Sequence, residues 1–75
     1  MMVKITNDLY LRAESIYSIK VVSEYKGEEE GGEVLIYSIV NGSKSINSYF
    51  FDTRMEAREF ANRIKLRINR WEDEN

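Results

Sequence analysis

The segment of residues 53–71 is the only part of this 75-residue chain in which apolar residues recur at helical spacing over several turns. At about 100° per residue, its apolar side chains fall within about 60° of one line, as in a helix that packs one side against a core. This stripe comprises Ala57, Phe60, Ala61, Ile64, Ile68 and Trp71. We therefore predict a single amphipathic helix, which limits how much of the remaining chain can be covered.

Both ends of the helix are marked in the sequence. Thr53 and Glu56 form a capping box, in which the hydroxyl and the carboxylate satisfy backbone donors of the first turn. Three carboxylates follow Trp71, where negative charge is unfavourable for the helix dipole. We predict that the helix begins near residue 53, that it ends at residue 71, and that residues 72–75 form an acidic tail exposed to solvent.

The chain before the helix alternates β-branched or aromatic residues with polar ones, which is typical of strands. A turn signal at Asn7 and Asp8 leaves two alternatives for the first segment, one bent strand or a tight hairpin. Residues 12–15 are expected to form a turn or a single helical turn. Strands are predicted at about residues 2–11, 16–25, 33–40 and 43–51.

Two turns connect the later strands. Residues 26–32, KGEEEGG, combine glycines with consecutive carboxylates and predict a flexible, solvated loop. Asn41 and Gly42 are the strongest hairpin signal in the chain. A two-residue turn there places Tyr37 opposite Ile46 and sets the register of both strands. Together these elements predict the α+β class, with an antiparallel sheet of three to four strands packed on one C-terminal helix in a single domain of residues 1–71.

Strand alternation divides the predicted sheet into two faces. We assign the more continuously apolar face to the helix, and it holds Leu35, Tyr37, Ile39, Ile46, Ser48 and Phe50. On the strand of residues 16–25, the side expected to point inward comprises Tyr17, Ile19, Val21 and Tyr25. The remaining face has no covering element, because one helix covers only one side of a sheet.

The uncovered face is our predicted partner-binding surface, and its anchors are Val34, Ile36, Tyr49 and Phe51. A second patch is predicted on the outer side of the helix, where Met55 and Leu66 lie about 160 to 180° from the core stripe. Large exposed apolar patches are uncommon on monomers. The sequence therefore favours a small protein-protein interaction or regulatory module that binds a protein partner, most simply a second copy in a homodimer. Its size suits a regulator or inhibitor, for example a phage-encoded one.

Catalysis is not expected. The chain has no cysteine and no histidine, so it lacks the usual zinc ligands, thiol nucleophiles and neutral-pH proton carriers. The run Glu28, Glu29 and Glu30 lacks the spaced ligand pattern of a calcium loop. We expect no enzyme activity, cofactor, metal site or small-molecule substrate. No segment approaches the roughly 20 apolar residues of a membrane span, and we expect a cytoplasmic protein without membrane association.

Nucleic-acid binding is the alternative function. Residues 53–71 carry six Lys or Arg against two Asp or Glu, although the whole chain has a net charge of −2. Such a helix can neutralise several phosphates. The residues predicted for this alternative are Arg58, Arg63, Arg67 and Arg70.

Overall fold

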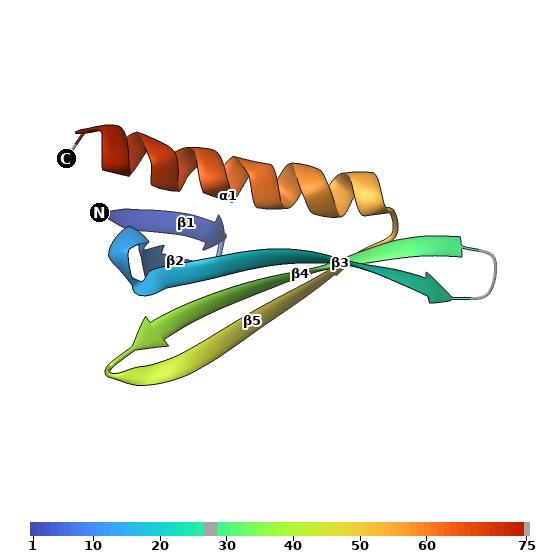
Figure 1. The fold of residues 1–75 in the computed structure, drawn as a ribbon, viewed down its shortest axis with the longest axis horizontal. Coiled ribbons are helices and arrows are strands. Elements are labelled where there is room, and N and C mark those ends of the chain that lie inside the picture. Colours follow the sequence, from blue (N-terminus) through green and yellow to red (C-terminus); the bar gives the residue numbers. More distant parts are fainter. Residues whose placement is uncertain (27–28, 75) are drawn as a thin grey trace.

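The computed structural model describes the backbone of residues 1–26 and 29–74 and the side chains of residues 1–22 and 31–70. It confirms the α+β class, with strands followed by one C-terminal helix (Figure 1). The elements in chain order are β1 (Met2–Thr6), β2 (Leu9–Arg12), η1 (Ala13–Ser15), β3 (Ile16–Lys26), β4 (Glu29–Val40), β5 (Ser43–Phe51) and α1 (Arg54–Glu74). The strands form two antiparallel sheets, a β1-β2 hairpin and a three-stranded sheet of order β3-β4-β5.

The first segment is a hairpin and not one bent strand. β1 pairs with β2 across the turn at Asn7 and Asp8, with an irregular register next to that turn. A short 3-10 helix, η1, follows and leads into β3, as expected for a single helical turn. The N-terminal strands therefore form their own small sheet.

The β4-β5 hairpin has the predicted register. Tyr37 pairs with Ile46, and Val40 pairs with Ser43 at the turn. Asn41 and Gly42 have φ angles of 52° and 80°, the left-handed values that a two-residue turn matching the strand twist requires. The Asn-Gly signal therefore fixes which side chains share a face.

The predicted loop at residues 26–32 is too long. β4 already begins at Glu29 and continues the pairing with β3, so Gly31 and Gly32 belong to a strand. Residues 27–28 lie outside the described part of the chain. Pairing across two long strands therefore outweighs the local preference of glycine and carboxylates for a loop.

The helix begins where predicted and ends later. The backbone N–H of Glu56 donates to Thr53 Oγ1 at 3.2 Å, and the Thr53 hydroxyl lies 3.3 Å from Glu56 Oε1. α1 continues to Glu74, so the predicted end at residue 71 is wrong. Carboxylates near a helix C-terminus typically cost only about 0.3–1 kcal/mol each, too little to end this helix.

The core lies between the three-stranded sheet and a layer made of α1 and the β1-β2 hairpin, both on one side of the sheet (Figure 1). Its buried residues are Val3, Ile5, Leu11, Ala13, Val34, Ile36, Ala57, Ala61 and Ile64. The predicted helix stripe is confirmed, with Phe60 and Ile68 partly buried at its margins. The side chain of Trp71 lies outside the described residues.

The helix covers the sheet face that carries Val34 and Ile36, so the predicted assignment of the two faces is wrong. Both side chains are 0% exposed. The opposite face carries three charged residues, Lys20, Glu33 and Lys44, which the register places among its apolar side chains. Burying these charges under a helix would cost more than exposing the apolar residues between them.

The inward side predicted for β3 is partly right, and the correct residues are Ile19 and Val21, which pack against the core. Tyr17 is exposed instead, because the register of β3 shifts between Ile16 and Ser18. At such a bulge the side chain of the extra residue points to the other face of the sheet than regular strand alternation predicts. The side chain of Tyr25 lies outside the described residues.

Candidate interaction surface

The uncovered side of the β3-β4-β5 sheet, called here the open face, concentrates large exposed side chains. Ile46 and Phe50 on β5 are 60% and 64% exposed, and Ile39 on β4 is 47% exposed. Strand pairing places Ile46 beside Tyr37 and Phe50 beside Glu33. The register places on the open face Ser18, Lys20, Val22, Glu33, Leu35, Tyr37, Ile39, Lys44, Ile46, Ser48 and Phe50, and a ring contact with Tyr37 adds Tyr17. On β4 the apolar and aromatic side chains of Leu35, Tyr37 and Ile39 follow one another, and on β5 Ile46 and Phe50 lie on either side of Ser48.

The four predicted sheet anchors are not on this open face. Val34 and Ile36 are core residues. Tyr49 and Phe51 are partly buried, and their rings lie 5.4 Å and 5.1 Å from the ring of Phe60 on α1. These four side chains therefore lie on the side of the sheet that α1 covers.

The predicted patch on the outer side of α1 is exposed. Met55 is 71% exposed and Leu66 is 60% exposed. They are separated by three turns of the helix and lie on the side away from the sheet. The exposure of both residues is confirmed, while partner binding by them stays a prediction.

On the β3 side of the open face, side chains of the same chain pack against one another. The rings of Tyr17 and Tyr37 lie 6.0 Å apart, and Lys20 Nζ lies 5.3 Å from the centre of the Tyr37 ring. This is the distance of a cation-π contact. Lys20 therefore covers the ring of Tyr37, whereas Ile46 on β5 is 60% exposed.

The charged residues of the open face are spread along it. Glu33 lies beside Phe50 at the end where α1 begins, Lys20 lies beside Leu35, and Lys44 lies beside Ile39 at the hairpin end. Ile39 is six positions beyond Glu33 on β4, which corresponds to about 20 Å of strand. The two ends of the face therefore carry opposite charges, Glu33 at one end and Lys44 at the other, with Lys20 between them.

A pocket of about 380 Å³, called here the hairpin-end pocket, adjoins the positive end. It lies between the β1-β2 hairpin and the end of β4, and its apolar lining includes Met2, Tyr10, Ile39 and Val40. Its volume is in the range of pockets that receive a ligand or an anchoring side chain. The sequence did not indicate this pocket, because it depends on the packing of two hairpins distant in the chain.

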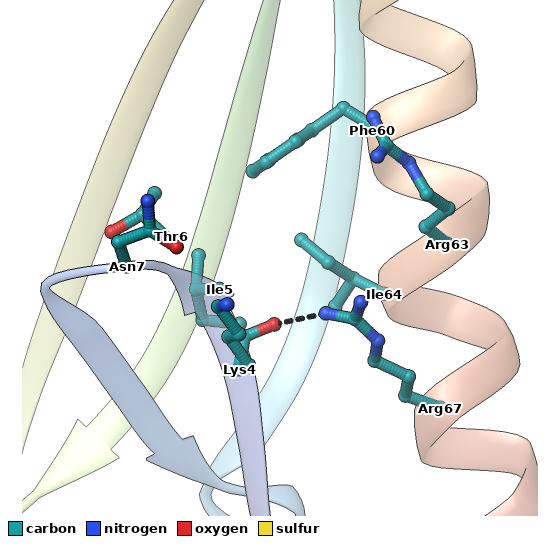
Figure 2. Close-up of a pocket in the computed structure, with 8 residues that line it drawn as sticks. All are labelled: Lys4, Ile5, Thr6, Asn7, Phe60, Arg63, Ile64 and Arg67. Atoms are coloured by element: carbon teal, nitrogen blue, oxygen red, sulfur yellow. Dashed lines mark hydrogen bonds between the residues drawn. The ribbon is translucent and has the colours of Figure 1, made fainter.

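Two of the four predicted nucleic-acid-binding arginines line a second pocket, called here the arginine pocket. It has a volume of about 400 Å³ and lies between the β1-β2 turn and α1 (Figure 2). Arg63 and Arg67 line it, and Arg67 Nη1 donates to the backbone carbonyl of Lys4 at 2.6 Å. Arg58 and Arg70 are exposed on α1 and do not line it.

The wall of the arginine pocket opposite the helix is a turn that is held in place by Thr6. The backbone N–H of Asp8 donates to Thr6 Oγ1 at 3.3 Å. Burial raises the pKa of the Tyr49 hydroxyl, and a hydrogen bond with Thr6 acts in the opposite direction. Thr6 therefore ties the β1-β2 turn to β5. Its role was not predicted, although the Asn7-Asp8 turn signal marked the place.

Neither a scan against protein-family models nor searches of curated proteins and of solved structures finds a match to this chain. Within the described residues, no helix combines the length and the apolar character needed to cross a membrane.

Proposed function

We propose that this protein is a small non-enzymatic interaction module that self-associates into a homodimer through the open face of its β3-β4-β5 sheet. One observation carries the proposal. Ile39, Ile46 and Phe50 are exposed together on a sheet face that no element of the described chain covers. A contiguous apolar patch of this kind is uncommon on a monomer and typical of an association surface.

The charges on the open face favour a second copy as the partner. A two-fold interface brings the same surface together twice and must be complementary to itself. If the two copies of β4 run in opposite directions, Glu33 of each copy approaches the end that carries Lys44 of the other. The negative and positive ends then meet in both halves of the interface. With the strands running in the same direction, like charges would face each other.

The same arrangement gives a place to bind to Phe50, the most exposed aromatic residue among the described side chains. Phe50 lies beside Glu33, so it is carried with Glu33 to the hairpin end of the second copy. The hairpin-end pocket adjoins that end, with Ile39 and Val40 in its lining. Aromatic side chains that enter apolar pockets commonly supply much of the binding energy of an interface.

A regulatory role in the cytoplasm, including one encoded by a phage, belongs to the same proposal. It is supported by the size and composition of the chain alone. A chain of 75 residues without cysteine or histidine has few groups suited to catalysis but enough surface for one specific interface.

Sedimentation equilibrium at micromolar concentration tests the proposal with two matched variants. Ile46 on the open face and Leu66 on the outer side of α1 are both 60% exposed. We expect a dimer for the wild type and for Leu66→Lys. Ile46→Lys should weaken association by roughly 30-fold or more, the loss expected at a central interface position. A monomeric wild type, or a dimer dissociated by Leu66→Lys and not by Ile46→Lys, would contradict the proposal.

Nucleic-acid binding through α1 is the second candidate function. The observation in its favour is that Arg63 and Arg67 line one pocket. The exposed positions of Arg58 and Arg70 outside that pocket favour a local anion site over a continuous basic surface along the helix. A strand that contacts all four arginines would show a log-log salt slope of about three to four.

A further inference from the structure

We propose that the arginine pocket binds the phosphate group of a small phosphorylated molecule. This inference does not depend on self-association, because the pocket lies between the β1-β2 turn and α1, on the other side of the sheet from the open face (Figure 1, Figure 2). Its volume of about 400 Å³ suits a ligand of the size of a mononucleotide.

Positive charge is concentrated in this pocket although the chain as a whole is acidic. Arg63 and Arg67 are four residues apart on α1, so their side chains are neighbours on one face of the helix. No aspartate or glutamate is among the described residues that line the pocket. The two positive charges of the guanidinium groups match the two negative charges of a phosphate dianion. A ligand with a single carboxylate would leave one of the positive charges without a counter-charge.

One of the two arginines is already held in position. Arg67 Nη1 donates to the carbonyl oxygen of Lys4 at 2.6 Å, which orients its guanidinium at the pocket (Figure 2). A guanidinium has five N–H donors, so the others can still serve a ligand. A donor that is fixed before binding loses less conformational entropy when the ligand arrives.

The rest of the lining indicates that the ligand carries an organic group as well as a phosphate. Ile5 and Ile64 are buried and form an apolar floor, with Phe60 at one side. Thr6 and Asn7 provide polar groups on the wall that faces the helix (Figure 2). Apolar surface combined with a few polar groups is typical of small-molecule pockets. We therefore expect adenosine monophosphate to bind more tightly than inorganic phosphate.

The test is an NMR titration of the full chain with adenosine monophosphate. We expect shifts of the amide signals of Thr6 and Asn7 that saturate with ligand. Arg63→Gln should weaken binding by about tenfold or more, since it removes charge-assisted hydrogen bonds. Arg70→Gln makes the same change of charge outside the pocket and should leave the affinity within about twofold, since no contact to the ligand is lost.

Asn7→Asp is a second variant, at an exposed turn position that tolerates aspartate. It places a negative charge opposite the arginines and should also weaken binding. Absence of saturable binding would overturn the proposal. So would an equal loss for Arg63→Gln and Arg70→Gln, because that result indicates general attraction to the helix and not a pocket.

A short single-stranded oligonucleotide in place of the mononucleotide identifies the source of the phosphate. Tighter binding of the strand, with the same selective loss in Arg63→Gln, would support the pocket and assign it to a nucleic-acid phosphate. Equal or weaker binding of the strand, with saturable binding of the mononucleotide, would support the pocket and assign it to a free ligand.

Discussion

Tyr49 shows how one side chain can join three elements of a small fold. It lies on β5, its ring packs against Phe60 of α1 at 5.4 Å, and its hydroxyl bonds with Thr6 of β1. Burial raises the pKa of this hydroxyl, because the charged phenolate loses hydration inside the protein. The folded state therefore holds the phenol proton to a higher pH than the unfolded chain does.

The raised pKa of Tyr49 predicts a fall in stability at alkaline pH. The contribution of the neutral Tyr49 phenol to the free energy of unfolding is fully present below the ordinary tyrosine pKa of about 10. It is lost as the pH rises through the higher pKa of the folded state. Tyr49→Phe should be about 1 kcal/mol less stable at neutral pH, since Thr6 loses a partner. Its urea midpoint should then decline less steeply above pH 10 than that of the wild type, as measured by urea unfolding over a pH series. If the urea midpoints of the wild type and of Tyr49→Phe declined equally above pH 10, the raised pKa of Tyr49 would be contradicted.

Single residues explain why the sheet anchors were predicted wrongly. Tyr49 and Phe51 look like binding residues in the sequence, because exposed aromatic side chains often anchor partners. Their actual contact is Phe60, which belongs to the core stripe of α1. That stripe was predictable from the spacing of its apolar residues alone. Which strand residues it packs against depends on which face of the sheet the helix covers.

At the scale of elements, α1 lies close against the sheet at Gly32. A Cβ atom built on Gly32 would lie 2.7 Å from Ala57 Cβ and 3.3 Å from the Cα of Arg54. Both distances are shorter than ordinary van der Waals contacts. Small residues on both sides thus set the distance between the helix and β4.

Gly32→Ala tests this close approach. We expect a loss of about 1–3 kcal/mol in the free energy of unfolding, because the helix backbone must shift to admit the extra carbon. Ala57→Gly alone should cost about 1 kcal/mol through its lower helix propensity. Chemical denaturation of the double variant should show a smaller loss of unfolding free energy than the sum of the two single losses, because Ala57→Gly removes the Cβ atom that overlaps with the new alanine. Additive losses would show that the two positions do not meet.

Elements defined by local signals were predictable, and the choice of face was not. The capping residues Thr53 and Glu56 and the Asn41-Gly42 turn act within a few residues, so their sequence pattern predicts their structure directly. The two faces of β4 and β5 are both apolar, and hydrophobicity alone selected the wrong one. Charges counted across the paired strands would have selected the right one, since Lys20, Glu33 and Lys44 share a face.

At the scale of the whole molecule, one side of the main sheet carries every covering element. The chain measures 44 × 26 × 20 Å along its principal axes, and α1 and the β1-β2 hairpin lie together on the side that carries Val34 and Ile36 (Figure 1). A single predicted helix already implied that one face would be left uncovered. The pockets were beyond sequence reasoning, because each joins segments distant in the chain.

An isotope-filtered NOE spectrum of a mixture of labelled and unlabelled chain tests the proposed interface most directly. It detects only contacts between protons of different copies. We expect such contacts for the methyl groups of Ile39 and Ile46 and for the ring of Phe50, and none for Met55 or Leu66. Contacts between copies at Met55 and Leu66, or the absence of any at Ile39, Ile46 and Phe50, would contradict association through the open face.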